Sequence, residues 1–225
     1  MTPKLLRLGA ARSPVVVIDD ATGAAREIVR LAASLAPFPK ARDNLYPGLR
    51  RMLGPADGDA FAYVERTLES LAPFIGGAFG FDSFTLSEAS FSLVTAPPET
   101  LAPAQRAPHF DSVDPNYLAI LHYLSDTPAS GTAFYRHRAT NVEEVGPGDL
   151  DRYVETARRE NAEAGGYVCG SNKHYEQIGE VESKQDRIAI YRGCLLHSGT
   201  IPPELALSGD PARGRLTANI FVAGA

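Results

Sequence analysis

The sequence predicts a mainly β fold in which two N-terminal helices support a sandwich of sheets and one further helix is inserted between strands. Before residue 80, apolar residues recur at spacings of three and four, which is typical of helices with one buried face. After residue 80, five segments rich in β-branched and aromatic residues are each bounded by turn residues. No linker separates the two parts, so we predict one domain over 1–225, with helical support over 1–80 and a strand core over 84–224.

For the N-terminal part, the sequence predicts a strand, two helices and a loop between the helices. Residues 14–20 (PVVVIDD) predict a strand, and residues 22–38 predict a helix that prolines at its end terminate. Residues 45–58 carry proline and glycine at turn spacing and predict a loop. A second helix begins near Asp59, and its core-facing stripe comprises Phe61, Val64, Leu68, Leu71 and Phe74.

The C-terminal part predicts a series of strands with one helix inside it. The predicted strands cover residues 84–96, 117–126, 131–138, 186–199 and 214–224. Between the third and fourth, residues 147–166 predict a helix with Asp149 as its N-cap and a Gly165-Gly166 stop. Its position between strands suits a lid, so this insertion and the NLYPGLRR loop (44–51) are the expected surfaces for substrate recognition.

Composition excludes several classes of protein. Hydrophobic residues make up 44% and charged residues 22% of the 225 residues, as in ordinary soluble globular chains. The net charge of −5, without a Lys/Arg cluster, argues against a nucleic-acid partner. The apolar runs are too short to span a bilayer, and Arg7 interrupts the only stretch that could begin a signal peptide. We therefore expect a cytoplasmic protein without a membrane partner, and its oligomeric state has no signal in the sequence.

The two cysteines indicate neither a disulfide framework nor a zinc site. Cys169 and Cys194 do not form a C-x-x-C pair, so a structural zinc site is not expected. Each is best interpreted as a small buried apolar residue, which suits a reducing compartment.

His109, Asp111 and His197 are the candidate metal ligands. The first two lie two residues apart in RAPHFDSVDPNY (106–117), and His197 ends an apolar segment just before Ser-Gly. Two imidazoles and one carboxylate on one side of a metal leave three octahedral positions free, as in non-haem Fe(II) oxygenases. Three protein ligands can also hold catalytic zinc, so the residues alone leave the metal open.

Arg215 and Thr217 are the candidate anion-binding residues. They lie two apart in GRLTANIFV (214–222), so on a strand both face the same side of the sheet. A guanidinium and a hydroxyl that point into a sandwich are costly unless an anion binds there. A dicarboxylate that binds Arg215 at one end and the metal at the other would satisfy both groups.

Taken together, the H-x-D motif at 109–111, the distal His197 and R-x-T at 215–217 resemble the signature of the 2-oxoglutarate/Fe(II)-dependent dioxygenase superfamily. The resemblance covers residues 84–224 in pattern and the helical part more loosely. It is to an uncharacterised bacterial group of that superfamily, whose layout is related to the prolyl-hydroxylase-like branch. It extends to the strand GTAFYRH and to RIAIYRGCLLHSG, which runs into the distal histidine. The H-x-D motif is intact, so the halogenase variant, which lacks the carboxylate, is not suggested.

The resemblance implies a double-stranded β-helix (jelly-roll) core and an enzyme that uses Fe(II), 2-oxoglutarate and O₂. It implies iron at His109, Asp111 and His197, and 2-oxoglutarate at Arg215 and Thr217. Tyr123 is a candidate second donor to the cosubstrate. The implied reaction is hydroxylation of an unactivated C–H bond of a small-molecule or peptidyl substrate. Arg213 would share the face of Arg215, but only Arg215 is followed two residues later by the threonine of the motif.

Two other functions remain open on the residues alone. A cupin-like metalloenzyme, such as a zinc or manganese hydrolase or isomerase, would use the same ligands without needing an inward-facing arginine. A non-catalytic binding module could keep the fold as a scaffold. Simpler structural roles also exist: Arg215 could pair with a carboxylate on a neighbouring strand, and Tyr123 could be a packed aromatic. His122 is expected in the core or on the sheet surface.

Overall fold

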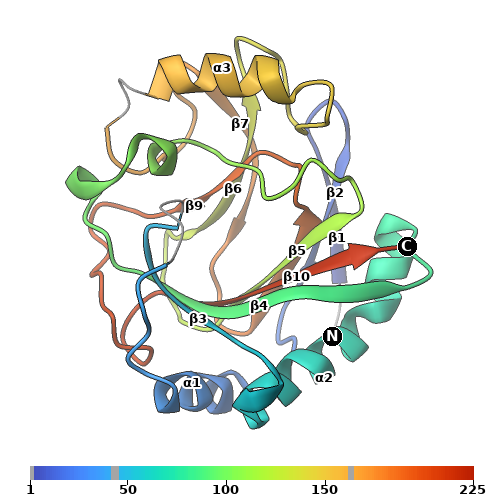
Figure 1. Ribbon diagram of the computed structural model, residues 1–225, viewed down its shortest axis with the longest axis vertical. Helices are drawn as coiled ribbons and strands as arrows, with labels where there is room; N and C mark the ends of the chain where they lie inside the picture. The colour runs from blue at the N-terminus through green and yellow to red at the C-terminus, as the bar shows by residue number, and fades with distance from the viewer. Residues whose placement is uncertain (1–2, 42–45, 162–164) are drawn as a thin grey trace.

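Two antiparallel sheets lie face to face in the computed structural model, which describes residues 3–41, 46–161 and 165–225 (Figure 1). The larger sheet has seven strands in the order β1-β2-β8-β5-β10-β4-β3, and the smaller has the order β7-β6-β9. The strands are β1 (Pro3–Leu8), β2 (Ser13–Ile18), β3 (Gly48–Met52), β4 (Phe84–Val94), β5 (Tyr117–Tyr123), β6 (Gly131–His137), β7 (Tyr175–Glu182), β8 (Arg187–Arg192), β9 (His197–Thr200) and β10 (Leu216–Gly224).

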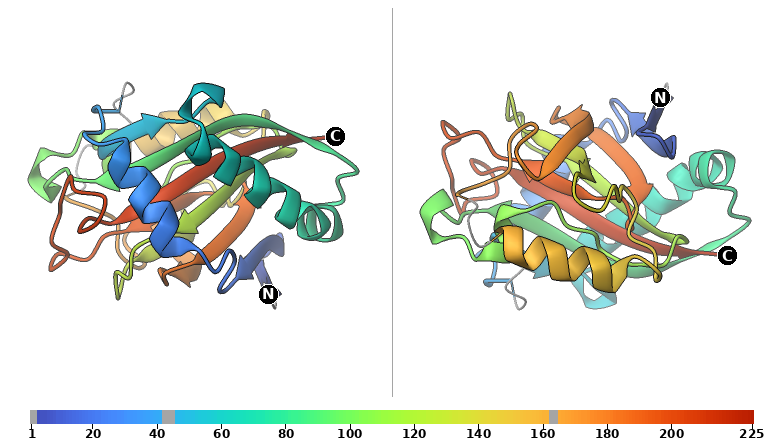
Figure 2. Two further views of the ribbon diagram at one scale, coloured as in Figure 1. Left: turned by 90° about the horizontal axis from the view of Figure 1, so that it is seen from below. Right: turned by 90° about the horizontal axis from the view of Figure 1, so that it is seen from above.

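Helices cover the two outer faces of this pair of sheets. They are α1 (Ala25–Ser34), α2 (Asp59–Phe79) and α3 (Leu150–Asn161), with short 3₁₀ helices η1 (Pro55–Asp57), η2 (Pro98–Thr100) and η3 (Pro103–Arg106). Figure 2 shows α1 and α2 across the outer face of the larger sheet and α3 on the opposite side of the molecule. The layers therefore run from α1 and α2 through the larger sheet and the smaller sheet to α3. None of the helices in the described ranges has the length and apolar character needed to span a bilayer.

Side-chain alternation along the central strands separates the helix-facing core from the space between the sheets. On β10, Leu216, Ala218 and Ile220 join the core beneath α1 and α2, while Thr217 and Asn219 face the smaller sheet. The apolar stripe of α2 packs into the same core through Val64, Leu68, Leu71 and Ile75. The mainly β fold with supporting helices is therefore confirmed, and its alternation leaves polar residues free to line a cavity.

Several predicted boundaries were wrong. The segment 186–199 is not one strand, because the chain leaves the larger sheet after β8 and enters the smaller sheet at β9. Gly193 lies at this crossing, where a side chain would come within 2.8 Å of Tyr117. The predicted loop 45–58 contains the edge strand β3, and β1 and β7 are further edge strands without a clear alternating pattern. The predicted helix 22–38 is shorter, and that at 147–166 is α3, with residues 162–164 outside the described ranges.

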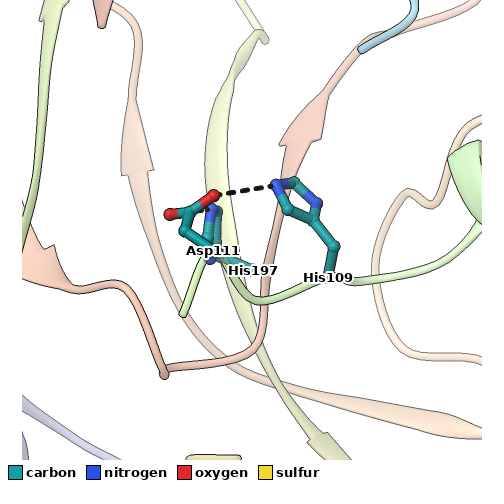
Figure 3. Close-up of side chains that lie close together, drawn as sticks. All are labelled: His109, Asp111 and His197. Carbon is teal, nitrogen blue, oxygen red and sulfur yellow. Dashed lines mark ion pairs between the residues drawn. The ribbon is translucent and has the colours of Figure 1, made fainter. Parts of the chain in front are cut away.

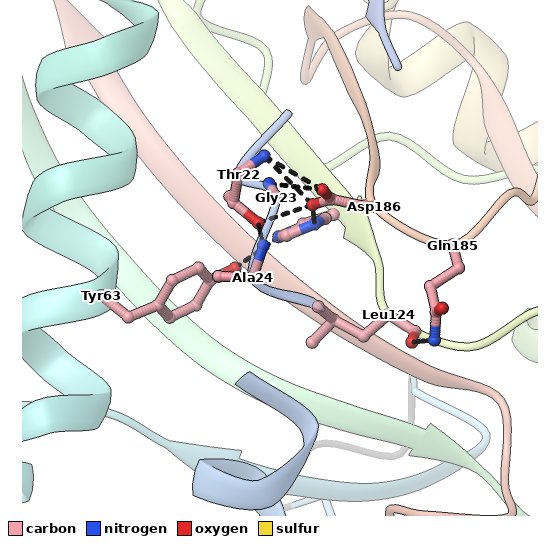
Figure 4. Close-up of polar contacts among 8 residues, drawn as sticks. Thr22, Gly23, Ala24, Tyr63, Leu124, Gln185 and Asp186 are labelled. Atoms are coloured by element: carbon pink, nitrogen blue, oxygen red, sulfur yellow. Dashed lines mark hydrogen bonds and ion pairs between the residues drawn. The ribbon is translucent and has the colours of Figure 1, made fainter. Parts of the chain in front are cut away.

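A buried polar chain joins α2, the larger sheet and the segment before α1 (Figure 4). Tyr63 donates its hydroxyl proton to His122 Nδ1 at 2.7 Å, and His122 Nε2 donates to Asp186 Oδ1 at 3.0 Å. Asp186 also accepts from the hydroxyl of Thr22 and the backbone N–H groups of Thr22 and Gly23. Burial raises the pKa of Asp186, but the hydrogen bonds from these partners outweigh it and hold the pKa at about 2. His122 is therefore a core residue in a satisfied network.

We expect this network to make the protein sensitive to acid. The pKa of Asp186 is lower in the folded chain than the usual value of about 4, so the unfolded chain binds this proton first as pH falls. The stability that Asp186 contributes is therefore present above pH 4 and is lost as pH falls towards about 2. Urea unfolding followed by circular dichroism at a series of pH values should show this loss in the wild type.

The variant Asp186→Asn isolates that contribution. Asparagine tolerates the left-handed backbone of residue 186 (φ 63°) but cannot carry the charge. We expect lower stability at neutral pH and a shallower decline between pH 4 and 2 than in the wild type, whereas Asp126→Asn, at an exposed position, should match the wild type. Equal acid slopes for Asp186→Asn and the wild type would contradict the assignment.

Candidate metal centre and the cavity around it

A cavity of about 310 Å³ opens between the two sheets, beside strands β3, β4, β10 and β5 of the larger sheet. The strand register places Arg50, Ser92, Thr217 and Tyr123 in one row across these four strands. The opposite wall comes from β9 and from the segment that follows η3. Of this row, Arg50 and Thr217 line the cavity, which β9 and the segment after η3 cover on the other side.

The three candidate metal ligands meet at one end of this cavity (Figure 3). One ligand atom from each of His109, Asp111 and His197 lies within 4.8 Å of the others. The Nε2 atoms of His109 and His197 lie 3.7 Å and 3.5 Å from the two carboxylate oxygens of Asp111. The structure thus brings together all three residues that the sequence pattern predicts as ligands.

Backbone hydrogen bonds hold this arrangement. His109 and His197 exchange a pair of N–H···O bonds of 2.8 and 2.9 Å, so the loop after η3 pairs with the start of β9. The N–H of Asp111 donates to the carbonyl of Gly193 at 2.7 Å. The H-x-D spacing therefore places both side chains on the same side of this short ladder, opposite the distal histidine.

The chemistry of the donors suits a divalent metal. His197 donates from Nδ1 to the carbonyl of Leu195 at 2.8 Å, which leaves its Nε2 lone pair directed at the site. Burial lowers the pKa of His197 to about 4. The pKa of His109 is also lowered, by partial desolvation in the cavity and by the neighbouring His197, although its side chain is 53% exposed. Burial raises the pKa of Asp111, against the opposing charges of His109 and Arg50. At neutral pH both imidazoles are neutral, the form that ligates metals.

Arg215 and Thr217 line the same cavity as the triad. Arg215 directly precedes β10 and is only 5% exposed; its Nε donates to Ser130 Oγ at 2.6 Å and its Nη2 to the Gly131 carbonyl at 2.8 Å. Within the described ranges no carboxylate lies within ion-pair distance of this guanidinium. Nη1 has no partner among those residues either, so the buried cation has donors left for an anion. Arg213 lies outside the strand in an exposed turn.

Tyr46, and not the candidate Tyr123, lines the cavity. Tyr123 is fully buried behind the cavity wall and donates its hydroxyl to Thr132 Oγ1 at 2.7 Å, and it is Thr132 that lines the cavity. Tyr46 does line the cavity, and its buried hydroxyl, near Thr217, has no hydrogen-bond partner within the described ranges. Burial raises the pKa of Tyr46, with the charge of Arg215 opposing. A tyrosine before Pro-Gly in a predicted loop gave no signal of this position.

The remaining histidines lie outside the cavity. His137 Nε2 and His174 Nδ1 both contact Glu160 Oε2, at 2.7 and 3.2 Å, and so tie α3 to the smaller sheet and the loop before β7.

The comparisons with known proteins identify the family. The family of unknown function DUF6445 matches residues 1–222 of the sequence. The chain belongs to this family. No curated protein matches the DUF6445 chain in sequence.

Solved structures show which fold the DUF6445 chain shares. The epimerase SnoN from nogalamycin biosynthesis, described as non-heme and alpha ketoglutarate dependent, has a TM-score of 0.58 at 13% identity, over 95% of this chain and 79% of SnoN. A Pseudomonas putida prolyl-4-hydroxylase has 0.51 at 14%, over 96% of this chain and 95% of the hydroxylase. HygX from Streptomyces hygroscopicus, solved with nickel and 2-oxoglutarate, has 0.52 at 17%, over 94% of this chain and 83% of HygX.

These similarities settle the fold of the DUF6445 chain. At such low sequence identity, similarity to these solved structures establishes the fold of the chain but not its activity. The chain has the jelly-roll fold of the Fe(II)/2-oxoglutarate-dependent enzymes, which confirms the expected superfamily resemblance at the level of fold. The His-Asp-His cluster in the cavity is a possible metal site of that kind.

Proposed function

We propose that this DUF6445 protein is an Fe(II)- and 2-oxoglutarate-dependent oxygenase that hydroxylates an unactivated C–H bond of a small-molecule or peptidyl substrate. The observation that carries the proposal is the shared cavity: it has His109, Asp111 and His197 at one end and, on its wall, a buried Arg215 without a carboxylate partner within the described ranges. A metal alone would explain the triad but not the arginine. An oxo acid with a second carboxylate explains both groups.

Each protein group has a defined task in this proposal. His109, Asp111 and His197 would hold the metal, because two neutral imidazoles and one carboxylate are a donor set that suits Fe(II). When bound, the iron and 2-oxoglutarate supply the oxidising chemistry, in which the oxo acid is converted to succinate and CO₂. Arg215 and Thr217 bind the far carboxylate and so fix the orientation of the oxo acid.

Competing functions make different demands on the cavity. A cupin-like hydrolase or isomerase has no use for the unpaired Arg215, so this residue favours the oxygenase. SnoN is described as an epimerase that depends on the same cosubstrate, so the fold also supports an outcome other than hydroxylation. Product analysis separates these outcomes, because hydroxylation adds one oxygen atom to the substrate and epimerisation leaves its mass unchanged.

The proposal is tested by titrating metal-free protein under anaerobic conditions, first with Fe(II) and then with 2-oxoglutarate. We expect stoichiometric iron binding, followed by a weak visible charge-transfer absorption when the oxo acid chelates the metal. Exposure to O₂ should then yield succinate. Iron binding without the absorption would overturn the cosubstrate assignment, and failure to bind iron would overturn the metal centre.

We also predict a specific effect of the Tyr46 hydroxyl. Tyr46→Phe should raise the KM for 2-oxoglutarate about tenfold, because one hydrogen bond to a charged carboxylate is lost. Affinity for Fe(II) should stay unchanged. Tyr135→Phe is a matched control: its hydroxyl is also buried without a partner within the described ranges, but it lies in the core near α3. Equal KM values for both variants would show that Tyr46 does not contact the cosubstrate.

A further inference from the structure

The cavity holds a second polar group that the proposed function does not use. It consists of Arg50 on β3, Glu88 on β4 and Asn219 on β10, and all three line the cavity. Arg50 is opposite Ser92 in the strand register, and Asn219 is opposite Ser90. Because alternate residues of β4 face the same side, Ser90 lies between the positions of Arg50 and Glu88, with Asn219 beside it. The three side chains therefore form one cluster on the cavity floor.

Arg50 is a cation whose Nε has no acceptor within the described ranges. Its guanidinium lies over the ring of Tyr46 at 4.7 Å, and its Nε is buried without a hydrogen-bond partner within the described ranges. Its ion pair with Glu88 is loose, since Nη1 and Oε1 are 3.7 Å apart, beyond hydrogen-bond distance. A planar guanidinium held in place with free donors is suited to bind a carboxylate.

Asn219 and Glu88, which lie beside Arg50, have acceptor atoms with few or no hydrogen-bond donors within the described ranges. The Asn219 Oδ1 atom is buried and lacks a donor within the described ranges. The carboxylate of Glu88 has only the loose contact with Arg50, and its side chain is 39% exposed. Within the described ranges, an amide oxygen without a donor and a carboxylate with one loose contact thus lie beside a guanidinium whose Nε has no acceptor. A ligand that has an ammonium group next to a carboxylate would satisfy all three side chains.

The short distance within the cluster restricts the ligand further. Because Arg50 and Glu88 approach within 3.7 Å, the two charges of the ligand have to be close together, as on the single α-carbon of an amino acid. The cavity of about 310 Å³ is at the lower end of ligand pockets, which are roughly 300–1,000 Å³, and the cosubstrate shares it. Tyr117 and Phe221, stacked at 5.6 Å on the same wall, offer an apolar surface to a side chain.

We propose that the substrate is a free α-amino acid whose carboxylate binds Arg50 and whose ammonium group binds Glu88 and Asn219. The inference rests on the proposed function, because it names the substrate class of that oxygenase site. Arg50, Glu88 and Asn219 line the same cavity of about 310 Å³ as His109, Asp111 and His197. The side chain of the amino acid would therefore lie near the metal, where its C–H bonds can react.

Isothermal titration calorimetry under anaerobic conditions tests the inference on protein that is first loaded with Fe(II) and 2-oxoglutarate. The probes are the twenty free amino acids, their methyl esters and their N-acetyl derivatives. We expect at least one free amino acid to bind, and its ester and N-acetyl derivative to bind at least tenfold more weakly. Arg50→Gln should abolish the preference over the ester, and Glu88→Gln the preference over the N-acetyl derivative. Arg51→Gln, on the other face of β3 and paired with Asp57, should match the wild type.

Four outcomes would overturn the inference. The first is that no free amino acid binds the loaded protein, and the second is that the blocked derivatives bind as tightly as the free ones. In the third, the preferences survive in Arg50→Gln and Glu88→Gln. In the fourth, Arg50→Gln loses 2-oxoglutarate before any amino acid is added, which would make Arg50 a cosubstrate residue. If the wild type binds no 2-oxoglutarate, the proposed function is wrong. The amino acids and their derivatives are then titrated into metal-free protein, and this measurement tests amino-acid binding independently of the oxygenase proposal.

Discussion

Replacement of Asp111 by alanine is expected to lower the affinity for Fe(II) by at least about 100-fold. Outer partners of metal ligands typically change metal affinity by about 10- to 100-fold, and Asp111 is the only carboxylate in the candidate ligand group found within the described residues. Two neutral imidazoles would remain, without the anion that balances the charge of the metal. Anaerobic titration with Fe(II), monitored by calorimetry, measures the change directly.

The fold should survive this substitution, because the backbone N–H of Asp111, and not its side chain, bonds the Gly193 carbonyl. Circular dichroism of the variant should therefore match that of the wild type. Asp126→Ala removes an exposed carboxylate outside the cavity and is the matched control, with unchanged iron affinity. An Asp111→Ala variant that still binds Fe(II) like the wild type would show that residues 109–111 form only a hydrogen-bonded loop and not a metal site.

Arg215→Ala should weaken 2-oxoglutarate binding by about 10- to 100-fold while leaving Fe(II) affinity intact. The loss corresponds to charge-assisted hydrogen bonds of about 1.5–3 kcal/mol between a buried guanidinium and a carboxylate. Arg215→Lys should show a smaller loss, because an ammonium keeps the charge but cannot form the planar fork. Titration of the iron-loaded variants with 2-oxoglutarate gives both values.

Arg213→Ala provides the control for Arg215. Arg213 carries the same charge two residues earlier, but it is exposed in the turn before β10. We expect its cosubstrate affinity to equal that of the wild type. If Arg215→Ala also binds 2-oxoglutarate like the wild type and remains folded, the assignment of the anion site is wrong, and a metalloenzyme without this cosubstrate becomes the better account.

The strongest sequence signals came from residues whose chemistry is expensive to bury. The H-x-D motif, the distal histidine and the R-x-T motif occur in the order seen in the 2-oxoglutarate/Fe(II)-dependent dioxygenases, and an inward-facing guanidinium needs an anion, so together they predicted one shared site. The structure brings these residues to one cavity. Their roles in binding iron and 2-oxoglutarate stay predictions.

The edge strands, and the position of Arg50 beside Glu88 in the cavity, could not be predicted from the sequence pattern. β3 covers only Gly48–Met52 and begins at the glycine of a Pro-Gly pair. These turn residues predicted a loop, because the alternation of apolar and polar residues along β3 is weak. β1 and β7 are largely polar or exposed, because an edge strand has little apolar surface to bury. Without β3, Arg50 had no assigned face, and its proximity to Glu88 depends on the pairing of β3 with β4. Such contacts follow from tertiary register and not from local pattern.

The ladder between His109 and His197 has a thermodynamic consequence. Its hydrogen bonds, with that from Asp111 to Gly193, order both ligand-bearing segments through the backbone alone. In many small metal-binding domains the ion has to offset the conformational entropy of an unstructured chain, so that folding and loading are a single event. Here the ordering belongs to the folding of the two sheets. We therefore expect the loading and unloading of an ion to be separable from folding.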